Sequence, residues 1–143
     1  MAAGNVVVYQ TGVRQILTQN HDLDSATLTC ALVSHGYSPN YASDSAWAQI
    51  TQELQTSGYT EKNLANAALT QVSDSFFMLD ADNITFSASA TMTAKYAVVR
   101  FNNGDQLLCY VDLDSGTTSG VDATQIVVQW NASGLFRVQN SGT

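Results

Sequence analysis

Three short acidic pairs are the first places in this chain where metal chemistry is conceivable. Asp112 and Asp114 stand two positions apart before Gly116, as the first carboxylates of a calcium-binding loop do. The EF-hand pattern also needs a third oxygen ligand and a glutamate at its twelfth position, and neither occurs in register. We therefore expect a turn in which the aspartates cap their own backbone, with no metal and no other cofactor. The same interpretation applies to the two remaining pairs, Asp22 with Asp24 and Asp80 with Asp82.

Residues suited to acid-base or nucleophilic catalysis are few. The chain has no Gly-x-Ser-x-Gly motif, and its two histidines, His21 and His35, lie in loop-like stretches. Glu53 and Glu61 are the only glutamates, and no pattern marks either of them as a general acid. A triad assembled in space stays open as an alternative. The sequence favours a protein that is not an enzyme.

The two cysteines, Cys30 and Cys109, each lie in an apolar stretch without Cys-x-x-Cys spacing. We expect buried free thiols, because cytoplasmic synthesis disfavours the disulfide that neighbouring strands would allow. The N-terminus lacks the features of a signal peptide, and no apolar run approaches the roughly 20 residues that span a bilayer. The expectation is a soluble chain made in the cytoplasm.

Four aromatic residues gather in the loop-rich middle of the chain, namely Tyr37, Tyr41, Trp47 and Tyr59. Two interpretations stay open: they form a patch that binds protein or carbohydrate, or they form a small core under the loops. The apolar N-terminus is a second candidate for contact with a partner. The candidate interface residues are Val6, Val7, Val8, Tyr9, Tyr37, Tyr41, Trp47 and Tyr59.

The elements that would position these residues begin with an N-terminal arm, residues 1–8, ahead of one β-rich domain, residues 9–143. Apolar residues at Tyr9, Val13, Ile16 and Leu17 predict a helix over residues 9–19 with this stripe on the core, although Gly12 weakens the pattern. Three further expectations are a half-buried strand at 27–33, a short helix that Ser43 or Asp44 caps and that runs through Trp47 and Ile50, and a polar edge strand at 52–57.

The second half of the chain reads as a series of short strands separated by turn residues. Asn103 and Gly104 supply the positive φ angles of a tight hairpin, and residues 131–134 form a second hairpin candidate. Evenly spaced strands of this kind predict a mainly β fold, a single antiparallel β-sandwich or jelly-roll-like domain with one or two short N-terminal helices. The predicted strands are residues 68–72, 76–79, 84–87, 96–101, 106–111, 125–130 and 135–138.

Charge excludes some partners. Charged residues make up 12% of the chain, about half the usual share, and the net charge is −7. The five basic residues are scattered singly, so the chain would repel nucleic acid and anionic membranes. Few charges and much uncharged polar surface suit a protein that lies against other proteins.

The order of segments resembles a family of small structural proteins of tailed-phage virions, encoded near capsid genes. The resemblance covers roughly residues 9–138 and implies a virion protein without catalytic residues. The loop at 115–120 lacks the proline that family members usually carry. The segments that carry the resemblance are the helix from Tyr9, the strand at 24–33, the loop at 36–41, and residues 79–87, 107–112, 125–131 and 134–138.

Within a virion, an acidic chain of 15.3 kDa fits the outer surface better than the DNA-facing side. The resemblance and the charge together predict a capsid decoration (cement) protein that binds the major capsid protein. Self-association is expected as well, with a homotrimer favoured and a homodimer next. The alternatives are a tail or neck component and a carbohydrate-binding host-attachment module, with a small hydrolase the least favoured.

Overall fold

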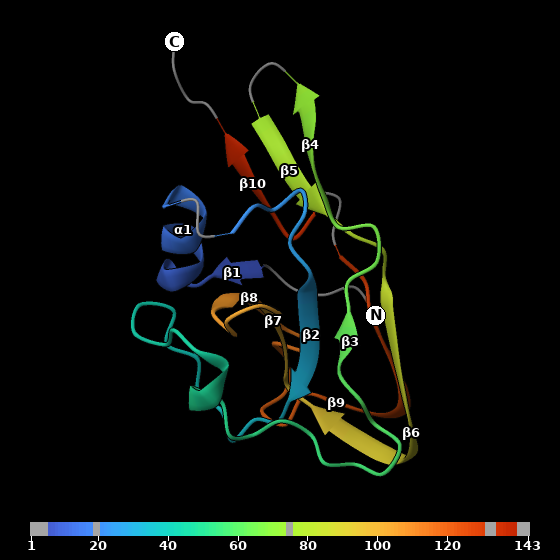
Figure 1. Cartoon of the computed structure of the whole chain (residues 1–143). Coiled ribbons are helices and arrows are strands. Elements are labelled where there is room, and N and C mark those ends of the chain that lie inside the picture. The colour runs from blue at the N-terminus through green and yellow to red at the C-terminus, as the bar shows by residue number, and fades with distance from the viewer. Residues whose placement is uncertain (1–5, 19–20, 74–75, 131–133, 140–143) are drawn as a thin grey trace.

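The computed structural model describes residues 6–18, 21–73, 76–130 and 134–139. Figure 1 shows a mainly β molecule with one short helix near the N-terminus, as the sequence predicts. The elements in chain order are β1 (Val6–Val8), α1 (Gln10–Leu17), β2 (Leu28–Val33), the 3-10 helix η1 (Trp47–Gln49), β3 (Lys62–Asn63), β4 (Ala68–Ser73), β5 (Phe76–Asp80), β6 (Ile84–Ala94), β7 (Tyr96–Phe101), β8 (Leu107–Asp112), β9 (Val121–Val128) and β10 (Phe136–Gln139).

The strands form three antiparallel sheets. The largest has the order β1-β8-β7-β2-β3, a long ribbon pairs β6 with β9, and a small sheet has the order β10-β5-β4. The small sheet lies at one end of the molecule, at the top of Figure 1. The antiparallel, sandwich-like architecture confirms the predicted fold class.

The main core lies between the large sheet and the β6-β9 ribbon. Phe86 and Met92 of the ribbon pack with Leu32 and Leu108 of the large sheet, and all four are fully buried. Every residue of β2 is buried, so the prediction of a half-buried strand was wrong. The reason is a second core on the other face of the large sheet, where residues such as Tyr37 and Ile50 cover Val33 and Val98.

Helix α1 forms where the sequence predicts it but presents a different face to the core. Gly12 is buried, and a Cβ atom on it would lie 2.7 Å from the carbonyl oxygen of Leu108. The helix therefore approaches β8 through its glycine, at backbone contact distance. Val13 and Leu17 are exposed, so the predicted core stripe was wrong for both residues.

Val6–Val8 is a strand of the domain itself and not a separate arm. It pairs antiparallel with β8, with Val6 opposite Val111 and Val8 opposite Cys109, at one edge of the large sheet. Residues 1–5 of the predicted arm lie outside the described residues.

Two expectations for the middle segment were wrong. Residues 52–57 form only an isolated bridge, between Glu53 and Val33, instead of an edge strand. The 3-10 helix is not capped by Ser43 or Asp44. The side-chain oxygen of Gln49 instead accepts hydrogen bonds from the backbone N–H groups of Ser45 and Ala46, at 2.7 and 2.9 Å.

The first predicted hairpin is confirmed and the second is not. β7 and β8 pair through a turn in which Gly104 and Asp105 have positive φ, whereas the sequence assigned the positive angles to Asn103 and Gly104. β9 and β10, the strands on either side of residues 131–134, belong to different sheets and do not pair with each other. Of these four, 131–133 lie outside the described residues.

The cysteines are buried free thiols, as predicted. Cys30 and Cys109 both pair with Val99, on opposite sides of β7. Two strand spacings, about 9–10 Å in all, separate them, which is too far for a disulfide. Burial raises the pKa of Cys30 to about 12 and raises that of Cys109 as well.

Candidate functional site

Two of the predicted interface tyrosines lie in the second core. Tyr9 and Tyr37 are buried, and their hydroxyl oxygens are 2.8 Å apart. The Tyr37 hydroxyl donates to Asp44 Oδ2 at 2.6 Å, so the Tyr9 hydroxyl donates to Tyr37. Burial is the main cause that raises the pKa of both phenols. These residues hold the segment around Tyr37 on the large sheet and present little surface to a partner.

The other predicted aromatics lie in different places. Tyr59 is half-buried against the main core, with its ring near Phe86, and Trp47 lies over Arg100 at 4.5 Å. Tyr41 is exposed. The four aromatic residues of the middle segment therefore do not form the shared patch that a carbohydrate-binding module would need.

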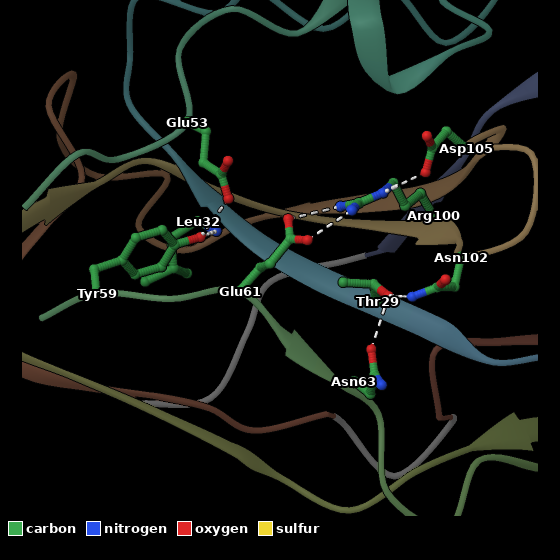
Figure 2. Close-up of polar contacts among 9 residues, drawn as sticks. All are labelled: Thr29, Leu32, Glu53, Tyr59, Glu61, Asn63, Arg100, Asn102 and Asp105. Carbon is green, nitrogen blue, oxygen red and sulfur yellow. Dashed lines mark hydrogen bonds and ion pairs between the residues drawn. The ribbon is translucent and has the colours of Figure 1, made fainter.

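A network of charged and polar groups crosses strand β2 (Figure 2). Arg100 of β7 donates two hydrogen bonds to the carboxylate of Glu61, at 2.7 and 2.9 Å, and its Nε atom donates to Asp105 at 3.2 Å. Bidentate pairs of this kind combine charge with fixed geometry. The Arg100 hydrogen bonds lower the pKa of Glu61, which thus stays ionised beside a nearly buried cation.

Glu53 lies on the same network in a different environment. The Tyr59 hydroxyl accepts from the N–H of Leu32 at 2.9 Å and donates to Glu53 Oε2 at 3.0 Å. Burial is the largest cause that raises the pKa of Glu53, and neighbouring Glu61 adds to it. The two glutamates thus have pKa values shifted in opposite directions, the pattern of an acid-base pair. Both carboxylates are engaged by side chains that tie the 53–61 segment to β2 and β7.

Neutral groups extend this network along the sheet. The Thr29 hydroxyl donates to Asn63 Oδ1 at 2.9 Å and accepts from Asn102 Nδ2 at 3.0 Å (Figure 2). Within the described part of the chain, no buried side-chain nitrogen or oxygen lacks a hydrogen-bond partner. The geometry accounts for the network as a structural tie between β3, β2 and β7.

A lysine ammonium group fills the acidic turn that follows β8. Lys95 Nζ lies 2.9 Å from Asp112 Oδ1 and donates to the carbonyl oxygens of Asp114 and Thr117 at 2.6 and 2.7 Å. The aspartates also accept from backbone N–H groups, Asp112 from Asp114 and Asp114 from Gly116. The predicted self-capped turn is therefore confirmed, and the nearly buried Lys95 supplies a cation at its centre.

The histidines lie apart from each other. His21 stacks on Phe101 with ring centres 4.1 Å apart, and its Nε2 atom is 3.0 Å from Gln106 Oε1, while His35 is exposed. Among the described residues, no group of three or more His, Cys, Asp or Glu side chains could hold a metal ion.

Most of the exposed large apolar side chains gather on two surfaces. In the described ranges there are six, between 43% and 76% exposed. Isolated exposed apolar residues are ordinary, whereas groups of them mark contact surfaces. The helix surface contains Val13, Leu17 and Tyr41, and the small-sheet surface contains Phe77 and Val138, which pair on one face of the small sheet. The sixth residue, Val72, lies at the bulge of β4 in the same sheet.

The helix surface is hollowed. A shallow depression runs between α1, the end of β1 and the loop that carries Tyr41. The backbone N–H of Gln10 donates to the carbonyl oxygen of Tyr41 at 2.8 Å, which fixes that loop against the helix. The residues that line the depression are Val8, Gln10, Val13, Arg14, Leu17, Thr18 and Tyr41.

The small-sheet surface arises because its strands extend past the core. Leu79 of β5 is fully buried, whereas Phe77, two residues earlier on the same face, is exposed. Phe77 pairs with Val138 of β10, so the exposed part of this face is apolar across two strands. The opposite face carries Arg137, which stacks on Phe76 at 5.0 Å.

Sequence reasoning identified Val8 and Tyr41 of these surfaces and missed the rest. Val13 and Leu17 were assigned to the core, and Phe77 was treated as an ordinary strand residue. Gly12 was the available signal, since a glycine inside a short helix often marks a close backbone approach. With Gly12 against the sheet, Val13 and Leu17 cannot share its face.

No protein-family model, curated protein or solved structure matches this chain at a significant level. None of the described helices is both long and apolar enough to cross a membrane.

Proposed function

We propose that this chain is a non-catalytic structural protein of a tailed-phage virion, and that it decorates the outer surface of the capsid by binding the major capsid protein. The observation that carries the proposal is the grouping of five of the six exposed large apolar side chains of the described residues on two surfaces. Two such surfaces on one small domain suit a protein that joins neighbours in a shell.

Charge and segment order support the same proposal. A net charge of −7 disfavours contact with packaged DNA and favours the outer face of a shell. The order of segments resembles small virion proteins, which supplies the virion setting. The polar groups of the Arg100 network and of the Lys95 turn are engaged in ties within the domain, which suits a structural role.

The first experiment measures the ratio of this protein to the major capsid protein in purified particles. We expect a copy number on the scale of the capsid protein itself, and a loss of heat resistance in particles that lack it. A copy number on the scale of tail components would favour the tail or neck alternative. Absence from particles would refute a virion role.

The second experiment asks whether the apolar surfaces bind the shell. Purified protein is added back to particles that lack it, as wild type, as Val13→Ser/Leu17→Ser, and as Phe77→Ser/Val138→Ser. We expect each double variant to rebind at least tenfold more weakly, because interfaces depend on buried apolar contacts. Gln125→Ser changes an exposed residue of β9 outside both surfaces and serves as the matched control. Equal rebinding by all variants would contradict the proposal.

A further inference from the structure

Arg14 is the one charged residue in the lining of the helix-surface depression. The other basic groups near apolar surface are engaged: Lys95 and Arg100 form ion pairs, and Arg137 stacks on Phe76. In the described part of the chain, the Arg14 guanidinium takes part in no ion pair. Within the described residues, an acidic protein thus presents a cation without a carboxylate partner in a largely apolar depression.

We propose that the helix surface binds an apolar protein segment that carries a carboxylate opposite Arg14. This inference rests on the proposed function, since it names the chemistry of the partner at one of its two contact surfaces. Leu17, Val13 and Tyr41 supply the apolar contacts, and tyrosine and arginine are the residues that interfaces favour.

Charge complementarity requires the carboxylate. A segment that covers Val13 and Leu17 also removes water from neighbouring Arg14, because all three line the same depression. A guanidinium buried without a partner is strongly unfavourable, whereas a carboxylate restores two charge-assisted hydrogen bonds. The partner segment must therefore pair apolar side chains with an aspartate or glutamate.

The same charge argues against a second copy of this chain in a symmetric contact. A twofold contact places the same patch on both sides of the interface. Two helix surfaces brought together would set one Arg14 against the other, and the lining offers no carboxylate to neutralise them. The occupant is thus a different surface, and under the proposed function it belongs to the capsid subunit.

The test is a selection of random short peptides displayed on yeast, with the whole purified protein as bait. We expect wild type to enrich peptides that combine apolar residues with an aspartate or glutamate. Arg14→Glu should bind these peptides at least tenfold more weakly, and should itself enrich peptides with lysine or arginine at the acidic position. Lys62→Glu makes the same charge change on an exposed residue of β3 and should bind as wild type does.

Three results would overturn the inference. They are the absence of any enriched peptide, enrichment of peptides without acidic residues, and equal binding by Arg14→Glu. Association of the wild-type protein with itself that Arg14→Glu abolishes, measured by sedimentation, would assign the surface to a second copy instead. Melting curves check that Arg14→Glu is folded, and Arg14→Gln replaces it if it is not. The outcome is separable from the proposed function, since presence in particles is measured without any peptide.

Discussion

The contact between Gly12 and β8 gives a sharp test of how the helix is docked. In Gly12→Ala the new Cβ atom would lie 2.7 Å from the Leu108 carbonyl oxygen, where ordinary contacts begin at 3.4 Å. The helix must then move by the difference, roughly 0.7 Å, or the strand must give way. The same oxygen accepts the N–H of Tyr9 at 3.0 Å, so the change also strains that hydrogen bond.

The expected size of the effect follows from three contributions. Alanine in place of glycine favours a helix by about 0.8–1.0 kcal/mol. Overpacking at backbone distance costs about 1–3 kcal/mol, and a weakened buried hydrogen bond costs about 1 kcal/mol. The sum predicts that Gly12→Ala lowers the free energy of unfolding by about 1–3 kcal/mol, or the melting temperature by about 3–10 °C.

Urea unfolding followed by circular dichroism measures this change directly. The matched control is Gly116→Ala, because Gly116 has no positive φ and its nearest neighbour is the Asp114 carboxylate oxygen at 3.3 Å. We expect the control to lie within about 0.5 kcal/mol of wild type. If Gly12→Ala matches or exceeds the stability of wild type, the helix does not dock through its glycine, and the outward placement of Val13 and Leu17 fails with it.

Four further predictions concern the polar groups and the thiols. Lys95→Met should lower the free energy of unfolding by about 2–4 kcal/mol in thermal melts, because the partly buried Asp112 loses its cation. A melting temperature equal to that of wild type would count against the ion pair. In wild type, EDTA should leave the melting temperature unchanged, since Lys95 occupies the turn; a drop on chelation would reveal a bound metal. The lowered pKa of Glu61 contributes stability that is present above its ordinary value of 4.5 and is lost as the pH falls through the folded value. Acid should therefore weaken wild type more than Glu61→Gln in urea titrations. Parallel pH profiles of the two proteins would contradict the ion pair. Cys30 and Cys109 should resist thiol reagents until the protein unfolds, and rapid labelling of the native protein would disprove their burial.

The strands of the second half were predictable because their signals are local. Alternating apolar residues and turn residues mark β4, β5, β7 and β8 within a residue or two of their observed bounds. The β7-β8 hairpin follows from the Asn-Gly pair in the same way. These features depend on neighbours in the sequence, so the sequence shows them directly.

What the sequence did not show depends on contacts between distant segments. Both faces of β2 are buried because the segment around Tyr37 and Ile50 folds over the large sheet. Lys95 reads as an ordinary charged residue until β8 brings the Asp112 turn to it. No local sequence pattern indicates either arrangement, because each depends on which strands lie side by side in the sheet.

Helix α1 also shows the difference between local sequence signals and contacts between distant segments. Tyr9 and Val13 lie on one predicted helical stripe, yet Tyr9 is fully buried and Val13 is exposed. Tyr9 precedes the helix with an extended backbone, so it does not follow the helical period. Once it is removed from the stripe, Gly12 is the only buried residue of α1, and the helix is fixed by a backbone contact that leaves Val13 and Leu17 outside while Ile16 packs partly against the core.

That arrangement bears on why the helix surface exists at all. A helix that served only to cover the sheet would stabilise the domain best by burying Val13 and Leu17, since each buried side chain of this kind contributes about 1.5–3 kcal/mol. The close approach at Gly12 forgoes that contribution while it fixes the helix tightly against β8. The apolar residues thus stand beside Arg14 on a helix that is docked closely against β8. Under the proposed function, a surface that is already in place loses little entropy when it binds a partner. The glycine that was the available signal for the core face is also the residue that leaves Val13 and Leu17 exposed for the proposed contact.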